Sequence, residues 1–192
     1  MQTPCVAALD CGTNSTRLLV VDPSGAVLAR EMGITRLGQG VDATGRLAPE
    51  AMERTLSVLR EYRQIMDATG VEHSRLAATS AARDAENGSE FLAQAAEAAG
   101  TEAEILSGTE EGELSYAGAT AGLAPCAGDD VVLDIGGGST ELIVARDGRI
   151  GAYSTQMGCV RMSERYLQHD PPTPEELDHM LVGIASELDR AL

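Results

Sequence analysis

Two short stretches of this sequence carry the same set of residues that could bind phosphate. "AALDCGTNSTRL" spans Ala7–Leu18 and "VVLDIGGGSTEL" spans Val131–Leu142. In both, an Asp follows an apolar run, and Gly and a Ser-Thr pair come next. Glycine lets backbone N–H groups approach a phosphate, hydroxyls add further donors, and a strand-end Asp can hold Mg²⁺ directly or through water. Six positions recur at one offset of 124 residues: Leu9, Asp10, Gly12, Ser15, Thr16 and Leu18 recur as Leu133, Asp134, Gly136, Ser139, Thr140 and Leu142.

The duplication makes this signal more specific than either stretch alone. A lone "GGGST" is more often a plain turn, and an Asp at a strand end can simply cap that turn. Two such loops facing each other across a cleft could instead hold phosphate from both sides. We therefore expect Asp10 and Asp134 to lie on opposite walls of one cleft.

The elements around the loops repeat as well. Strands are predicted near residues 5–10, 17–22 and 26–31, and again near 131–135, 141–146 and 149–157, with "DG" at 147–148 as a tight hairpin turn. Further strands are expected at 74–80 and 102–106. Helices are predicted from Pro49 to Gly70, from an N-cap at Ser89 to Gly100, at 109–123, at 161–168, and from the cap Thr173 onward. This pattern indicates an α/β fold built by duplication of a subdomain.

Composition narrows the class of protein. The net charge of −16 argues against general binding of nucleic acids or anionic membranes, since both require a basic surface. No apolar run approaches the length of a membrane helix. Cys5, Cys11, Cys126 and Cys159 form no CxxC pair, so we expect reduced cysteines and a cytoplasmic protein.

Four separate motifs resemble one family. "TSAARDAENGSEFL", "ILSGTEEGELSYAGA", "LDIGGGSTEL" and "MGCVRMSERYL" together are similar to the exopolyphosphatase/guanosine pentaphosphate phosphohydrolase (Ppx/GppA) family. The resemblance covers essentially the whole chain. It implies the superfold of actin, hexokinase and Hsp70, with two RNase H-like domains. It also implies Mg²⁺-dependent (or Mn²⁺-dependent) release of terminal phosphate from inorganic polyphosphate or pppGpp.

The resemblance also assigns roles to individual residues. It implies Glu111 as the general base and Arg83 as a phosphate-contacting cation, and it adds Glu141 to Asp10 and Asp134 as a group that orders metal or water. The alternatives are a helix-dipole partner for Glu111 and a surface salt bridge for Arg83. The implied phosphate-binding residues are Gly12, Thr13, Asn14 and Ser15 in the first loop, and Gly136, Gly137, Gly138, Ser139 and Thr140 in the second.

Two departures from the family pattern lead to further expectations. Family members usually continue well beyond this length, so we expect a first domain at 1–126 and an incomplete second domain at 127–192. Its final helix should then lack part of its cover at Leu177, Met180, Leu181, Ile184 and Leu188. The chain has only 14 Lys and Arg residues. Either the substrate is a short polyphosphate or a guanosine phosphate, or the missing part of the second domain carries the basic residues.

Three functions from different classes stay open at this point. The protein could be the phosphohydrolase, a kinase or ATPase of the same superfold, or a non-catalytic phosphate-binding regulator. Glu111 within "SGTEEGEL" favours the phosphohydrolase. The sequence leaves the oligomeric state open, with a homodimer among the options.

Overall fold

The computed structural model describes residues 4–124 and 129–191. The chain divides into two compact units, Met1–Ile105 and Leu106–Leu192. The expected domain boundary between residues 126 and 127, and Cys126 itself, lie outside the described residues. The domain limits of 1–126 and 127–192 therefore stay a prediction.

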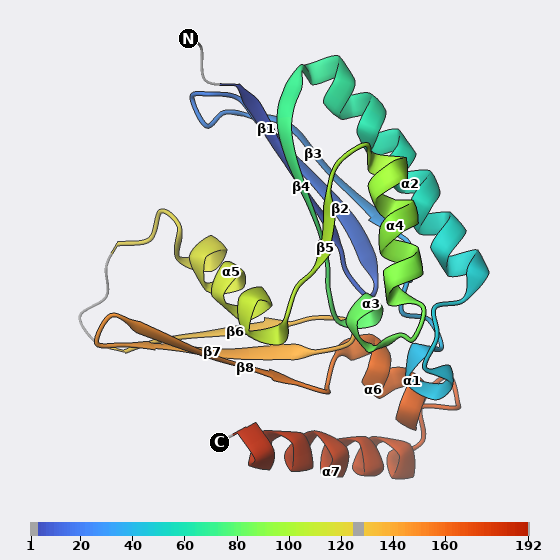
Figure 1. Cartoon of the computed structure of the whole chain (residues 1–192). Coiled ribbons are helices and arrows are strands. Elements are labelled where there is room, and N and C mark those ends of the chain that lie inside the picture. The colour runs from blue at the N-terminus through green and yellow to red at the C-terminus, as the bar shows by residue number, and fades with distance from the viewer. Residues whose placement is uncertain (1–3, 125–128, 192) are drawn as a thin grey trace. The chain divides into compact units, whose positions relative to one another are not determined.

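The first unit is built on a five-stranded mixed sheet (Figure 1). Its strands lie in the order β3-β2-β1-β4-β5. The first three strands form antiparallel hairpins, whereas β4 runs parallel to β1 and β5 parallel to β4. The bounds are β1 Cys5–Cys11, β2 Ser15–Val21, β3 Val27–Ile34, β4 Val71–Ala78 and β5 Ala103–Ile105.

Helices α2 (Pro49–Thr69) and α4 (Gly88–Ala99) lie along this sheet in Figure 1 and close its core. The core includes Leu9, Leu18, Leu59, Leu76 and Phe91, all nearly inaccessible to solvent. Helix α2 starts at Pro49 and is capped at its C-terminus by Gly70, as expected. Two short helices, α1 (Val41–Thr44) and α3 (Ser80–Asp84), were not predicted.

The predicted N-cap of α4 is wrong by two residues. The N-cap is Asn87, and its side chain caps no N–H group of the helix. Instead, its Oδ1 accepts the Leu47 N–H at 2.8 Å and its Nδ2 donates to the Leu47 carbonyl at 3.1 Å. A contact 40 residues away in sequence therefore sets where this helix begins.

We expect Gly88→Ala to destabilise the protein by at least about 1–3 kcal/mol, the usual cost of overpacking. A Cβ at Gly88 would lie 1.9 Å from the backbone oxygen of Ala82, which cannot move as a flexible side chain can. The matched control is Gly118→Ala, also in a helix but with open space around the new Cβ. It should raise stability by up to about 1 kcal/mol. Urea unfolding measures both, and equal effects would contradict the packing argument.

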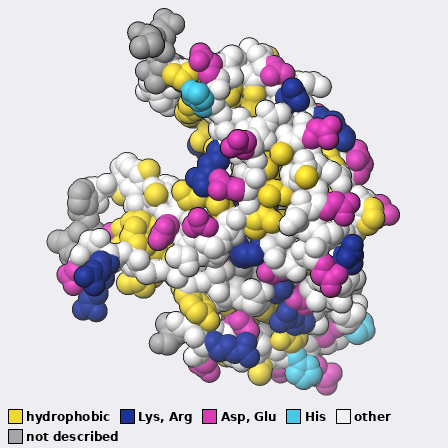
Figure 2. All heavy atoms as spheres, in the orientation of Figure 1, with side chains coloured by type: hydrophobic (Ala, Val, Ile, Leu, Met, Phe, Trp, Pro, Cys, Tyr) yellow, Lys and Arg dark blue, Asp and Glu magenta, His cyan; other side chains and the backbone are white. Residues whose placement is uncertain are grey.

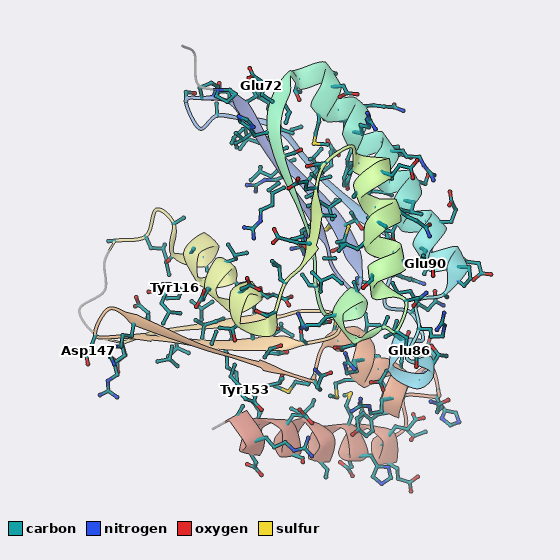
Figure 3. All side chains as sticks on the ribbon, viewed as in Figure 1. Glu72, Glu86, Glu90, Tyr116, Asp147 and Tyr153 are labelled. Carbon is teal, nitrogen blue, oxygen red and sulfur yellow. The ribbon has the colours of Figure 1, made fainter. Side chains whose placement is uncertain are left out.

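The second unit contains a three-stranded antiparallel sheet in the order β6-β7-β8. Asp147 and Gly148 join β7 to β8 with φ angles of 50° and 72°, so the expected tight turn is confirmed. In Figure 3, Asp147 marks this turn and Tyr116 on α5 extends toward β6, where its hydroxyl bonds Asp130 at 3.1 Å. The elements of the unit are α5 Gly108–Thr120, β6 Asp130–Ile135, β7 Thr140–Arg146, β8 Arg149–Thr155, α6 Cys159–Tyr166 and α7 Pro174–Ala191.

Much apolar surface of the second unit is exposed, as expected. No residue of α7 is buried, and Leu181 is 59% exposed. On β6, alternate residues point to solvent, and Ile135 is 72% exposed.

The expected cap of α7 is also confirmed, because the Thr173 hydroxyl accepts the Glu176 N–H at 3.3 Å. On the face drawn in Figure 2, apolar and acidic side chains are interspersed. Within the described residues, no helix is both long and apolar enough to cross a membrane.

Candidate active site

The two glycine loops have the same local geometry. The Gly12 N–H donates to the Ser15 carbonyl at 3.0 Å, and the Gly136 N–H donates to the Ser139 carbonyl at the same distance. A Cβ at either glycine would lie 3.1 Å from that carbonyl oxygen. The sequence repeat is therefore a repeat of backbone structure, with a tight turn after β1 and after β6.

The first loop packs on the helix that carries Arg83. The Thr13 hydroxyl lies 3.0 Å from the Ser80 hydroxyl, and both residues are buried. Ser80 begins α3, and Arg83 lies in the last turn of the same helix. Gly38 closes the other side of Thr13, since a Cβ there would lie 2.3 Å from the Thr13 methyl group. The first unit thus brings Arg83 and the first loop into one packed region.

Cys11 precedes the first loop but is chemically inert. It is fully buried, and burial, followed by the charge of Asp10, raises the pKa of its thiol to about 12. Only the thiolate is nucleophilic, so Cys11 is poorly suited to covalent catalysis.

We therefore expect iodoacetamide at about pH 8 to modify the exposed Cys159 of the native protein and to leave Cys11 unmodified. Peptide mass spectrometry after timed labelling checks this order. Unfolding in urea is the control and should make Cys11 reactive. Modification of native Cys11 as fast as Cys159 would contradict its burial.

Three carboxylates gather around the start of the second loop. Asp134 at the end of β6 pairs with Glu141 on β7, and Glu141 pairs with Ser154 on β8. The Ser154 hydroxyl donates to Glu141 Oε1 at 2.7 Å. From α5, Glu111 interacts electrostatically with Glu141, and the Ser115 hydroxyl donates to Asp134 Oδ2 at 2.5 Å.

Helix α5 can carry Glu111 to this sheet because it is capped and because glycines face the strands. Ser107 and Glu110 form a capping box, with the Ser107 hydroxyl accepting the Glu110 N–H at 3.2 Å. A Cβ at Gly108 would lie 2.5 Å from the Ser154 Cβ, and one at Gly112 would lie 2.7 Å from the Ala152 Cβ. Both glycines permit a close approach of helix and sheet. Glu110 is therefore used in the cap, whereas Glu111 is the acidic residue coupled to Glu141.

Glu141 is the most unusual carboxylate of the cluster, since only 1% of its surface is exposed. Burial raises its pKa above the ordinary value, and the charges of Glu111 and Asp134 raise it further. Hydroxyl groups of Ser154 and Ser139 oppose this shift by hydrogen bonding to the carboxylate. A buried carboxylate beside two others is a setting in which a cation would be favourable.

Asp134 and Glu141 are oxygen ligands of the kind that hydrated divalent cations accept. Among the described residues, no group of three or more His, Cys, Asp or Glu side chains could hold an ion by itself. Mg²⁺ usually keeps several waters and binds one or two carboxylates together with substrate phosphates. Asp134 and Glu141 fit that role. Mn²⁺ accepts the same oxygen ligands.

Of the predicted site residues, the second unit brings together Glu111, Asp134 and Glu141 with the second loop. In the first unit, the helix that carries Arg83 packs on the first loop, which follows Asp10. It stays a prediction that the two sets of residues face one another across a cleft.

The Thr140 hydroxyl donates to the Met157 carbonyl at 2.6 Å. Its role in phosphate binding also stays a prediction.

Sequence reasoning missed the hydroxyl groups that support the carboxylates and the first loop. Ser115 follows Glu111 by four residues, so helical spacing alone could have placed both on one face of α5. Ser80 lies within the "TSAARDA" motif that carries Arg83. No motif in the sequence near Ser154 indicates its role, because only the register of β7 and β8 places it opposite Glu141.

Comparison with known proteins gives consistent results. The family model described as the Ppx/GppA phosphatase family matches residues 20–191. Exopolyphosphatase 2 of Mycobacterium tuberculosis is 45% identical over 97% of this chain and 62% of its own length.

Solved structures agree with this result. A crystal structure of an exopolyphosphatase-like protein is 39% identical, with a TM-score of 0.90 over 100% of this chain and 62% of the other. The Aquifex aeolicus member of the Ppx/GppA family is 33% identical, with a TM-score of 0.74 over 98% of this chain and 62% of the other. The chain thus spans about 62% of the length of these relatives.

Proposed function

Because the chain belongs to the Ppx/GppA phosphatase family, we propose that the protein releases terminal orthophosphate from inorganic polyphosphate, from pppGpp, or from both. The observation that carries this proposal is the carboxylate cluster of Glu111, Asp134 and Glu141 beside the second loop. A phosphate-binding loop alone would suit a kinase or a sensor equally well. A carboxylate beside the loop supplies a base that a sensor does not need. Kinases use such a base too, so the choice of water as the acceptor rests on the family, which is a phosphatase family.

The proposed fold is a pair of duplicated RNase H-like domains of the actin-like ATPase type. The strand order β3-β2-β1-β4-β5, with three antiparallel strands followed by parallel ones, supports this for the first unit. The second unit contains the equivalent antiparallel strands β6, β7 and β8. In this proposal the two loops occupy equivalent positions and bind one substrate between them.

Phosphoryl transfer to water depends mostly on positioning and on neutralising charge. In the proposed mechanism, backbone N–H groups of the two loops hold the terminal phosphate, together with the hydroxyls of Thr13 and Ser15. The Ser139 hydroxyl bonds Glu141 instead, so Ser139 would act through its backbone. Arg83 offsets negative charge on the substrate. Glu111 accepts a hydrogen bond from the attacking water and takes its proton as the new P–O bond forms. The bond from the terminal phosphorus to the bridging oxygen breaks in the same step, and that oxygen leaves as the new terminal phosphate oxygen of the shortened substrate.

The metal in this proposal is Mg²⁺, or Mn²⁺, which Asp134 and Glu141 would hold, with Asp10 of the first loop ordering one of its waters. When bound, it supplies positive charge to the phosphate oxygens and the leaving group. The strongly acidic composition supports this need, because a net charge of −16 repels a polyanionic substrate. We further propose a cytoplasmic protein. A homodimer stays an expectation.

The experiment that tests this function is release of orthophosphate by the complete natural protein. Short polyphosphate, long polyphosphate and pppGpp are supplied in parallel, with Mg²⁺ or with excess chelator. We expect release that requires the metal. No release from any substrate would overturn the proposed function, and full activity in chelator would remove the metal from it.

A further inference from the structure

The second glycine loop is hydrogen-bonded to the first turn of α6. Its three glycine carbonyls all accept hydrogen bonds from that segment. The bonds run from the Cys159 N–H to the Gly136 oxygen at 2.9 Å, from the Val160 and Arg161 N–H groups to the Gly137 oxygen at 2.9 and 3.1 Å, and from the Arg161 Nε to the Gly138 oxygen at 2.6 Å.

These bonds fix the direction of the loop's amide groups. In a planar trans peptide, the N–H of one residue points opposite to the carbonyl of the residue before it. With the carbonyls of Gly136 and Gly137 directed at α6, the N–H groups of Gly137 and Gly138 point the other way. Within the described part of the chain, neither N–H group is used in a hydrogen bond. Both are therefore available to an anion.

Gly158 makes this close approach possible. A Cβ at this position would lie 2.4 Å from the carbonyl carbon of Gly137 and 2.5 Å from the nitrogen of Gly138. Its φ of −147° is ordinary extended backbone. The glycine is therefore required for space against the loop rather than for conformational freedom.

In the first unit, carbonyl groups of the first loop likewise accept backbone hydrogen bonds from another segment of the chain. The Thr13 carbonyl accepts the Gly38 N–H at 2.9 Å, and the Asn14 carbonyl accepts the N–H groups of Thr35 and Arg36 at 3.1 and 3.0 Å. The sequence repeats here too, because "MGITRL" at 32–37 corresponds to "MGCVRM" at 157–162. Two independent copies of the arrangement indicate that it belongs to the loops and not to α6 alone.

We propose that Arg161 and Gly158 are positioning residues, which hold the second loop so that the N–H groups of Gly137 and Gly138 face the terminal phosphate of the substrate. This inference rests on the proposed function. The Arg161 guanidinium touches a loop carbonyl, so its effect on the substrate passes through the loop. A purely structural role for Arg161 would instead change stability and leave phosphate binding intact.

The test compares Arg161→Ala, Arg161→Lys and Arg165→Ala in the complete natural protein. Arg165 is the matched control, since it is an exposed arginine on the same helix. The measurements are kcat and KM for phosphate release, the Kd for inorganic phosphate and the melting temperature. Small misplacements in an active site can cost about 100-fold, so we expect Arg161→Ala to lower kcat/KM by about 10–100-fold and to weaken phosphate binding.

Arg161→Lys should restore most of both properties, because an ammonium can also donate to the Gly138 carbonyl. Arg165→Ala should match the wild type. Gly158→Ala should have a larger effect, and if it fails to fold, the arginine variants still decide. Wild-type kcat/KM and phosphate Kd in Arg161→Ala would overturn the inference. Wild-type protein that binds phosphate without hydrolysing any substrate would overturn the proposed function alone, and protein that does neither would overturn both.

Discussion

Glu111→Gln should lower the turnover number by about 10²–10⁴-fold, the usual loss when general-base assistance is removed. The substitution keeps the size of the side chain and its capacity for hydrogen bonding but removes the basic carboxylate. Glu111 lies on α5 within electrostatic range of the buried Glu141. Steady-state release of orthophosphate from polyphosphate and pppGpp by the complete natural protein measures the effect.

The stability of the Glu111→Gln protein should not fall with its turnover number. Glu111 raises the pKa of Glu141 by like-charge repulsion, so its neutralisation relieves strain in the folded state. We therefore expect the melting temperature of Glu111→Gln to equal or slightly exceed that of the wild type. An enzyme that is slower but no less stable is the combination expected of a catalytic group.

Glu110→Gln is the matched control, one residue away on the same helix. Glu110 accepts the Ser107 N–H at 2.9 Å and the Ser107 hydroxyl at 2.7 Å within the capping box. Gln is also accepted at this position of the motif, so the helix should begin as before and turnover should stay near the wild-type rate. If Glu111→Gln is as active as Glu110→Gln, Glu111 is only a partner of the helix dipole and the catalytic assignment fails.

The sequence predicts well where structure is set by local chemistry. The hairpin turn at Asp147 and Gly148, the cap at Thr173 and the end of α2 at Gly70 all depend on residues adjacent in the chain. The tight turn at the start of each loop is equally local, because Gly12 and Gly136 each donate to a serine carbonyl three residues later. Each of these features follows from a few neighbouring residues.

The sequence predicts poorly where a distant contact decides. Helix α4 begins after Asn87 because that side chain bonds the backbone of Leu47, and no pattern near Ser89 reveals it. Helices α1 and α3 are too short to show a periodic pattern. In the candidate site, motifs identify Glu111, Asp134 and Glu141, but only strand register and helix packing bring Ser154 and Ser115 to them.

Asp134→Asn should lower turnover by at least about 10–100-fold, the loss usual when groups that order a metal and its ligands are changed. It should also raise the Mg²⁺ concentration needed for the half-maximal rate. Asn keeps the shape of Asp134 and an oxygen that can accept the Ser115 hydroxyl, but it removes the negative charge. Titration of activity with Mg²⁺, alongside thermal unfolding, separates the effect on the site from any effect on the fold.

Strand β6 supplies a control for this prediction. Asp130 and Asp134 lie on the same strand, and each accepts a hydrogen bond from a hydroxyl on α5, from Tyr116 at 3.1 Å and from Ser115 at 2.5 Å. They differ in position, since only Asp134 lies at the loop end of the strand and pairs with Glu141. If a charged partner for α5 is all that matters, both Asn variants should behave alike. If proximity to the loop and to Glu141 matters, only Asp134→Asn should alter the Mg²⁺ dependence. Equal shifts in both variants would contradict a specific role of Asp134 in ordering the metal.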